Sequence, residues 1–120
     1  MHHCIAASVL AGNNIIVDHV LEDKQWLEEC VRLLAGFSVL FVGVRCSLEE
    51  LERRERKRNR QQGLAGYQFG LVHAHGVYDL EVDTSVYSPM DCALQIKEAL
   101  RDIHSSNAFT NLRDLLPEND

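Results

Sequence analysis

Several features that would define the class of a protein at once are missing from this chain of 120 residues. No stretch approaches the ~20 consecutive apolar residues that a membrane-spanning helix needs. The N-terminal sequence MHHCIAASVLAG has neither the basic start nor the long apolar run of a signal peptide. We therefore expect a cytoplasmic protein with no membrane partner.

Paired metal or redox motifs are also missing. The four cysteines form no CxxC pair, so we expect buried thiols rather than a disulfide or redox site. They are Cys4, Cys30, Cys46 and Cys92. His73 and His75 lie two residues apart and would diverge on a helix. No cysteine or carboxylate lies near them at a helpful spacing, so we favour packing or capping roles for both histidines.

The sequence also lacks a phosphate-binding loop. It contains neither GxxxxGK(S/T) nor GxGxxG, and its seven glycines are never clustered ahead of a helix. Only three lysines occur, at positions 24, 57 and 97, and none of them stands where a P-loop lysine would. The motifs of the chain therefore do not make a complete nucleotide site.

What is present is the pattern of a single α/β domain. The length, the 46% hydrophobic and the 25% charged content are those of an ordinary soluble globular protein. Three short β-branched runs predict buried strands, at residues 15–17, 39–44 and 80–82. Segments of helical period lie between them. This alternation predicts a parallel sheet with flanking helices.

Local signals predict where helices begin and which face they bury. Ser47 is followed three residues later by Glu50, which makes a capping box. Ser88 precedes Pro89, a residue favoured at the first helical position. Segment 22–36 places one apolar face on Leu27, Cys30, Val31 and Leu34.

The ends of the predicted strands carry polar residues. In an open parallel sheet, ligands collect outside the carboxyl ends of the strands. Asp18 and His19 end the first predicted strand, and an apolar strand that ends in an acid has the shape of a Walker B element. Such an aspartate holds Mg²⁺ directly or through water, or orients a substrate hydroxyl. A helix-capping role for Asp18 stays open, since acids often end strands for that reason.

Residues 53–60 stand out by charge. They hold six Lys/Arg and one Glu, or +6 − 1 = +5, so the rest of this chain of net charge −6 sums to −6 − 5 = −11. Arg54 and Arg58 are four residues apart and share a helix face, from which guanidinium groups can bind a phosphate bidentately. A solvated helix that pairs with its own glutamates is the alternative. A nucleic-acid partner is least favoured, because the remainder is acidic and no aromatics are interleaved.

The stretch VLFVGVRCSLEELERRERKRNRQQGLAGYQFGLVHAHGVYDLEVDTS, followed by the CALQI helix, resembles the chloramphenicol phosphotransferase-like proteins. These are small P-loop kinases with an adenylate- or shikimate-kinase-like fold. AGNNIIVDHVL is similar to their Walker B-type strand, and the resemblance runs from about residue 6 to residue 100. It implies transfer of the γ-phosphoryl group of ATP, with Mg²⁺, to a hydroxyl of a small molecule. Chloramphenicol is the substrate that names the family.

The resemblance also implies a lid. Residues 53–63 match the arginine-rich segment that closes over the nucleotide phosphates in the family. Arg54, Arg58 and Arg60 fall on lid arginines, so all three are expected at the nucleotide. Arg54 and Arg58 are further expected to stabilise the phosphoryl group during transfer.

The remaining site residues come from the strand ends. Asp18 falls on the Walker B strand end, which implies a catalytic residue that holds Mg²⁺ indirectly. His19 replaces a second acid of the family and is expected at the substrate. Thr84 and Ser85 fall on the loop that borders the adenine.

The family's first strand, Walker A loop, first helix and activating carboxylate have no counterpart in this sequence. The resemblance therefore implies an N-terminally truncated P-loop kinase-like domain over residues 1–104, with a polar, loosely docked tail over residues 105–120. Because the first strand is central in the family, we expect exposed edges. Exposed sheet edges favour pairing with a second copy of the chain, as a homo-oligomer, or with a separate N-terminal polypeptide. The alternative to an ATP-dependent O-phosphotransferase is an inactive remnant or partner-dependent fragment.

Overall fold

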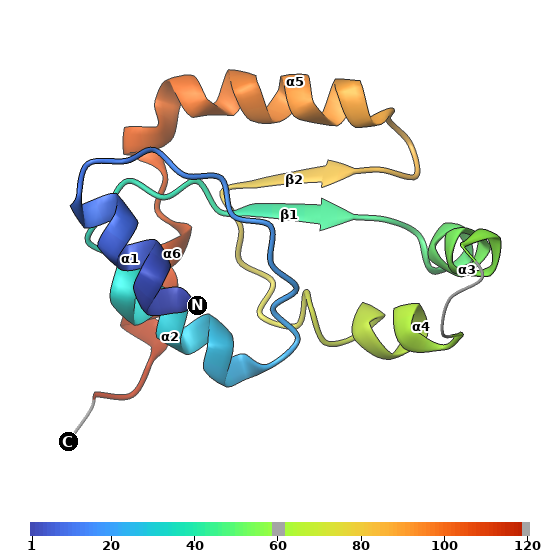
Figure 1. Cartoon of the computed structure of the whole chain (residues 1–120), viewed down its shortest axis with the longest axis horizontal. Helices are drawn as coiled ribbons and strands as arrows, with labels where there is room; N and C mark the ends of the chain where they lie inside the picture. The colour runs from blue at the N-terminus through green and yellow to red at the C-terminus, as the bar shows by residue number, and fades with distance from the viewer. Residues whose placement is uncertain (59–61, 119–120) are drawn as a thin grey trace.

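The computed structural model describes residues 1–58 and 62–118. Its elements, shown in Figure 1, are α1 (His2–Leu10), α2 (Lys24–Leu34), β1 (Val42–Arg45), α3 (Leu48–Lys57), α4 (Leu64–Phe69), β2 (Leu80–Asp83), α5 (Pro89–Ala99), the 3-10 helix η1 (Leu100–Ser105) and α6 (Ala108–Leu115). Arg60, which the sequence assigns to a lid, lies outside the described residues. No helix within the described ranges is long and apolar enough to cross a membrane.

The sheet is parallel, as the sequence predicts. β1 pairs with β2 in a register that sets Val42 opposite Leu80 and Arg45 opposite Asp83. Helix α5 runs along one side of the sheet, and the carboxyl ends of both strands point towards α3 and α4 (Figure 1). The α/β class with flanking helices is thereby confirmed.

The predicted first strand is not formed. Residues 13–20 have no regular secondary structure, so the described sheet has two strands rather than the three expected. Backbone N–H and C=O groups of a strand need a partner strand, and in the described chain the strands β1 and β2 pair only with each other. Ile16 is 98% exposed, although its β-branched neighbours suggested a buried strand.

The predicted helix starts are confirmed. The Ser47 hydroxyl accepts a hydrogen bond from the backbone N–H of Glu50 at 3.3 Å, and the Ser88 hydroxyl accepts one from the N–H of Asp91 at 3.1 Å. Pro89 opens α5 as expected. These side chains satisfy N–H groups that the first helical turn leaves without partners.

The core lies beside the amino ends of the strands, between α2 and α6. The apolar face predicted for α2 is confirmed, since all four of its residues are buried. Phe109 and Leu112 of α6 pack against it. The prediction of a loosely docked tail is therefore wrong for residues 108–115. The polar composition of this segment concealed three apolar residues at helical spacing, Ala108, Phe109 and Leu112.

Asp79 ties α6 to the sheet. One carboxylate oxygen accepts from the backbone N–H groups of Asn107 and Ala108 at 2.8 and 2.9 Å, and the other accepts from the N–H of Phe41 at 2.8 Å. A negative charge at a helix N-terminus is also favoured by the helix dipole. A single side chain thus fixes both the start of α6 and the approach to β1.

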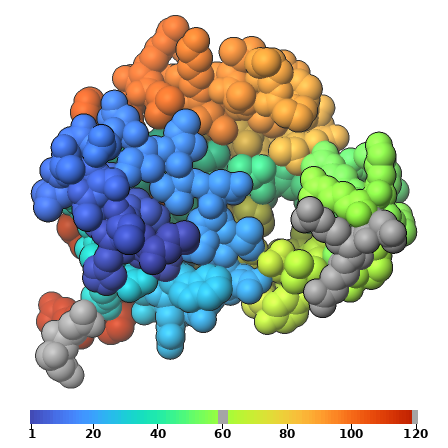
Figure 2. Space-filling model, in the orientation of Figure 1, coloured from blue at the N-terminus to red at the C-terminus, as the bar shows by residue number. Residues whose placement is uncertain are grey.

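The molecule is more extended than its length suggests. Its radius of gyration is 15.5 Å, whereas a compact domain of this size has about 14 Å. Figure 2 shows the reason: the α3–α4 pair stands out at one end of the molecule. The site described next lies where this pair meets the sheet.

The cysteine prediction is partly confirmed. All four cysteines are free thiols. Cys30 and Cys92 are buried, Cys46 is half-buried and Cys4 is exposed.

Candidate functional site

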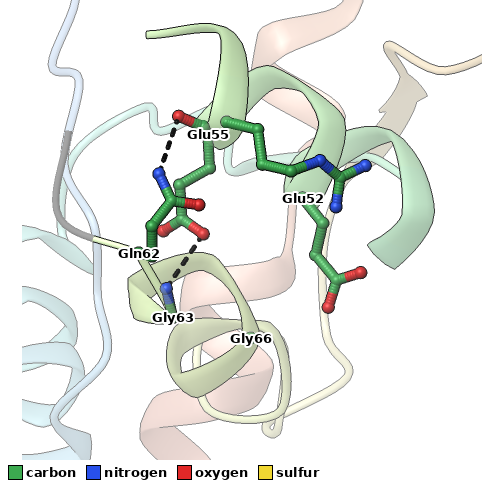
Figure 3. A pocket seen from close by; sticks show the side chains of 6 residues that line it. Glu52, Glu55, Gln62, Gly63 and Gly66 are labelled. Carbon is green, nitrogen blue, oxygen red and sulfur yellow. Dashed lines mark hydrogen bonds between the residues drawn. The ribbon is translucent and has the colours of Figure 1, made fainter. Parts of the chain in front are cut away.

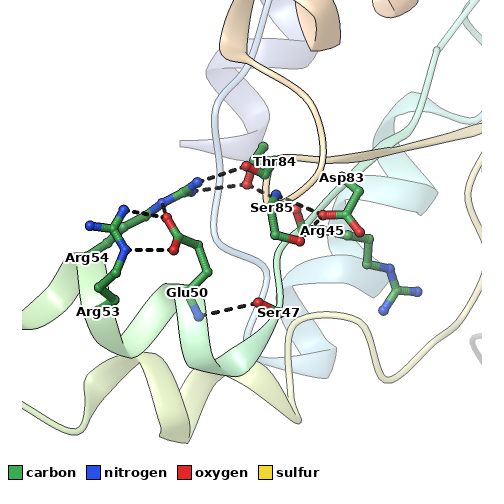
Figure 4. Close-up of polar contacts among 8 residues, drawn as sticks. All are labelled: Arg45, Ser47, Glu50, Arg53, Arg54, Asp83, Thr84 and Ser85. Carbon is green, nitrogen blue, oxygen red and sulfur yellow. Dashed lines mark hydrogen bonds and ion pairs between the residues drawn. The ribbon is translucent and has the colours of Figure 1, made fainter.

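Arg54 and Thr84, which the sequence assigns to two different elements of the site, are in direct contact. The guanidinium of Arg54 donates from Nη1 to the Thr84 hydroxyl at 3.1 Å and from Nη2 to the Thr84 carbonyl at 2.8 Å (Figure 4). The Thr84 hydroxyl in turn donates to the carbonyl of Arg45 at 3.1 Å. Helix α3 is thereby fastened to the carboxyl ends of both strands.

Glu50 orients the arginines of α3. Its carboxylate accepts from Arg54 Nε at 2.8 Å and from Arg53 Nε and Nη2, each at 2.8 Å (Figure 4). Hydrogen bonds from Arg53 and Arg54 lower the pKa of Glu50 to about 2. Glu50 is therefore ionised at neutral pH and holds Arg54 in position from the side opposite Thr84.

A cleft of about 400 Å³ lies between α3, α4 and the end of β1. Arg54 and Arg58 both line it, so the prediction that these two arginines share a face is confirmed. Val20, at the end of the irregular segment, also lines the cleft. The apolar part of the wall comprises Val20, Val44, Leu51, Leu64, Phe69 and Val72. An apolar cleft with a few convergent charged groups is the usual form of a small-molecule site.

Glu55 holds the two helices of this cleft together. Its carboxylate accepts from the backbone N–H of Gly63 at 3.0 Å (Figure 3). It also accepts from the backbone N–H of Ala65, in the first turn of α4, at 3.0 Å. These bonds lower the pKa of Glu55. The Glu55 carboxylate therefore caps α4, whereas the solvated-helix interpretation would pair it with an arginine. Glu50 does pair with Arg53 and Arg54, as that interpretation expects. A smaller pocket of about 280 Å³ lies beside this contact, between α3 and α4.

Ser85 and Asp83 form a tight turn at the end of β2. The backbone N–H of Ser85 donates to Asp83 Oδ1 at 2.8 Å, and its hydroxyl donates to the same oxygen. Both bonds lower the pKa of Asp83, which stays ionised. Ser85 thus lies next to the Arg54 contact, and its hydroxyl is engaged within the turn.

Asp18 and His19 do not line the cleft that Arg54 and Arg58 line, although Val20, the next residue along the chain, does. Asp18 is exposed on the irregular segment. Magnesium in kinase sites is commonly held by one or two carboxylates together with substrate phosphates, a role that one exposed carboxylate fits. His19 is half-buried, and its ring stacks on Trp26 with the ring centroids 5.8 Å apart. Burial and the nearby His2 lower the pKa of His19.

The packing role expected for His73 and His75 is confirmed. His75 stacks on Phe41 with ring centroids 5.3 Å apart, and His73 Nδ1 lies 2.5 Å from the Tyr78 hydroxyl. Burial lowers the pKa of both histidines. They belong to an aromatic cluster with Phe41 and Tyr78, and His73 also lines the cleft.

Sequence reasoning missed the contribution of α4 to the cleft. Gly63 has φ 92°, a left-handed conformation that glycine adopts readily, and it turns the chain so that α4 lies against α3. Gln68 of α4 donates to Glu22 at 2.8 Å and so links α4 to the segment before α2. Gly63, the first glycine of QQGLAG, is the sequence signal that could have predicted this turn.

Comparisons with known proteins agree with this geometry. The chain matches the family model "Chloramphenicol phosphotransferase-like protein" over residues 1–101. It is 33% identical over 113 residues to "Putative O-phosphotransferase Rv2636" of Mycobacterium tuberculosis, and equally to "Putative O-phosphotransferase MT2714" of a second strain. The match covers 93% of this chain and 50% of each relative, so the chain spans about half their length. No solved structure matches significantly. The chain belongs to the chloramphenicol phosphotransferase-like family.

Proposed function

We propose that this chain forms the arginine-bearing part of an ATP-dependent O-phosphotransferase, which transfers the γ-phosphoryl group to a hydroxyl of a small molecule. Family membership and the names of the mycobacterial relatives support a phosphotransferase. The observation that carries the proposal is the Arg54–Thr84 contact at the mouth of a cleft that Arg58 also lines. This is the place where ligands of parallel sheets collect.

Arg54 is suited to hold a phosphate without leaving its place. A guanidinium has five N–H donors. Three of them donate to Glu50 and Thr84 among the described contacts. Two donors remain for oxygens of the nucleotide. Because both neighbours hold the group in one orientation, little side-chain entropy is lost when a phosphate binds.

Arg58 supplies the second charge. It is exposed at the end of α3 and lines the same cleft as Arg54, one helical turn away. Two guanidinium groups around a transferring phosphoryl group stabilise the charge on its equatorial oxygens. We propose the same role for Arg60, and a position beside the adenine for Thr84 and Ser85.

Asp18 and His19 complete the proposal. Asp18 would hold Mg²⁺ through water, and the ion would neutralise the nucleotide phosphates. His19 would lie near the acceptor hydroxyl. Chloramphenicol is the first acceptor to test because the family carries its name, although no residue of the cleft singles it out.

The backbone cradle for the β- and γ-phosphates has to come from outside these 120 residues, because they contain no GxxxxGK(S/T) loop. We propose that a strand carrying this loop lies between the irregular segment 13–20 and β1. Exposure of Ile16 and the half-length match to the relatives support this arrangement. A second copy of the chain is the other partner we consider for the exposed apolar residues.

The test is complementation. The chain would be mixed with the half of the mycobacterial relative that it does not match, and transfer of labelled phosphate from ATP to chloramphenicol and other small alcohols would be measured. We expect activity only in the mixture, and a strong loss with Arg54→Ala but not with Arg53→Ala. A well-formed complex with no transfer to any acceptor would favour an inactive remnant instead.

A further inference from the structure

Three side chains that the phosphotransfer proposal does not bring together converge at the start of α1. His2 comes from α1, His19 from the irregular segment and Cys30 from α2. One ligand atom of each lies within 4.8 Å of the other two. His2 and Cys30 are buried and His19 is half-buried. Two imidazoles and a thiol from three separate segments therefore face one small volume.

The two nitrogens are spaced nearly as around a tetrahedral ion, and the sulfur would have to move closer to them. His2 Nε2 and His19 Nε2 lie 2.9 Å apart, and the three ligand atoms, with the Cys30 sulfur, lie within 4.8 Å of one another. Around a zinc ion with Zn–N of about 2.0 Å and Zn–S of about 2.3 Å, tetrahedral angles put two nitrogens about 3.3 Å apart and a nitrogen and sulfur about 3.5 Å apart. The two rings need to separate by only a few tenths of an ångström. Ligation would also replace a nitrogen–nitrogen contact in which a single proton is shared.

Glu29 prepares His2 for this role. Its Oε2 accepts a hydrogen bond from His2 Nδ1. With its proton on Nδ1, the imidazole directs the Nε2 lone pair towards His19 and Cys30. A carboxylate behind a histidine fixes the tautomer and raises the basicity of the ligating nitrogen, as in many zinc sites.

We propose that His2 Nε2, His19 Nε2 and Cys30 Sγ form a site for a zinc-type divalent cation, with the fourth position taken by water. Imidazole and thiolate ligands favour zinc over Mg²⁺ and Ca²⁺, which take oxygen ligands. Three protein ligands leave one tetrahedral position open.

Binding of the ion by Cys30 would exchange a proton for the metal. When the zinc–sulfur bond forms, the S–H bond breaks and its proton passes to the buffer.

Zinc would fasten residues 13–20 to the helices. Those residues have no strand partner in the described chain, and His19 would become an anchor between α1 and α2. The neighbouring Asp18 would then have a fixed position. This inference does not depend on the phosphotransfer proposal, but it reassigns His19 from the substrate to the metal.

Cobalt substitution tests the site in the intact chain. Co²⁺ bound by a thiolate gives an intense sulfur-to-metal absorption band in the near ultraviolet, together with visible bands of tetrahedral Co²⁺. We expect one equivalent of Co²⁺ to produce both bands and one equivalent of Zn²⁺ to remove them. Trp26, the single tryptophan of the chain, stacks on His19 and gives a second readout through its fluorescence.

Matched variants locate the ion. Cys30→Ser should abolish the sulfur band, and His19→Gln should weaken metal binding by at least about 10-fold. His3→Gln and Cys92→Ser are the controls, since they remove the same residue types without removing one of the three ligands, although His3 lies 3.4 Å from Glu29, the carboxylate that also contacts His2. The His3→Gln control also tests whether Co²⁺ is bound instead by the exposed His3 together with the terminal amine, because such binding would be lost in this variant. His19 lies outside helices and strands, so its variant remains informative if Cys30→Ser fails to fold.

The two outcomes are distinct. The site is supported if the Co²⁺ absorption bands and the Trp26 fluorescence change are lost in the His19 and Cys30 variants while both control variants stay near wild type. No thiolate band at micromolar Co²⁺, or binding that disappears with His3→Gln and persists in His19→Gln, would overturn it.

Discussion

Arg54 is joined to Thr84 by two hydrogen bonds, of 3.1 and 2.8 Å, while the adjacent Arg53 is bonded only to Glu50 among the described contacts. Neighbouring arginines of one helix therefore have different surroundings. Arg54 is fastened to the carboxyl end of the sheet, and Arg53 faces solvent. This difference makes Arg53 a natural control for experiments on Arg54.

Thr84→Val should weaken the contact between α3 and the sheet. The valine keeps the shape but removes the hydroxyl that accepts from Arg54 and donates to Arg45. We expect the free energy of unfolding to fall by about 1–2 kcal/mol in urea titrations. Thr110→Val, at an exposed position of α6, is the control. Equal stability of the two variants would show that the Thr84 contact contributes little.

Gly43→Ala should destabilise the sheet. A Cβ at Gly43 would lie 2.7 Å from two ring carbons of Tyr78, which is well inside contact distance. Overpacking of this kind costs about 1–3 kcal/mol. Gly66→Ala is the control, because a Cβ there meets nothing within 4 Å. A melting temperature of Gly43→Ala equal to or above that of Gly66→Ala would contradict the close packing of Gly43 against the Tyr78 ring.

Asp79→Ala should detach α6. The substitution leaves three backbone N–H groups without their acceptor. Loss of a helix cap and of two partly buried hydrogen bonds predicts a loss of about 2 kcal/mol in the free energy of unfolding. Asp114→Ala, exposed on the same helix, should change it by less than about 0.5 kcal/mol. Similar midpoints for the two variants would contradict the anchoring role of Asp79.

Acidification below neutral pH should destabilise the protein through two half-buried histidines, His73 and His75. Burial lowers the pKa of His73 and His75 in the folded state, whereas the unfolded histidines titrate near about 6.5. Below about pH 6.5 the unfolded state therefore binds more protons at these two histidines than the folded state does. The contribution of the neutral histidines to the free energy of unfolding is complete above about pH 6.5 and is lost as the pH falls further.

Urea unfolding between about pH 5 and pH 7.5 would measure this effect above the range in which carboxylates titrate. The slope of stability against pH should be smaller in the double variant His73→Gln/His75→Gln. An unchanged slope would mean that these histidines do not carry the pH dependence.

Much of the local structure could be predicted from the sequence. Ser47 and Ser88 cap helices as their motifs indicate, and the buried face of α2 follows its periodicity. The strand that the sequence predicts at residues 15–17 does not form, because a β-branched run becomes a strand only when another strand pairs with it. The arginine face was visible as the four-residue spacing of Arg54 and Arg58. The choice of Thr84 as the partner of Arg54 depends on tertiary contacts that no local pattern reports.

The cluster of His2, His19 and Cys30 could not be read from spacing either. The three residues lie on separate segments, and a pattern search looks for ligands at short, regular intervals. The packing of α1 against α2 brings them together. Sites built from distant single residues become visible only in the folded chain.

The central claim, that the α3–α4 cleft faces nucleotide phosphates, is tested most directly by titrating MgATP into two double variants of equal charge. Arg54→Ala/Arg58→Ala removes the two guanidinium groups that line the cleft, and Arg53→Ala/Lys57→Ala removes two positive charges from the same helix. We predict measurable binding to the wild-type chain, a loss of at least about 10-fold in the first variant, equivalent to about 1.4 kcal/mol, and less than about 3-fold in the second. Equal losses in both variants, or no binding to the wild-type chain, would contradict the claim.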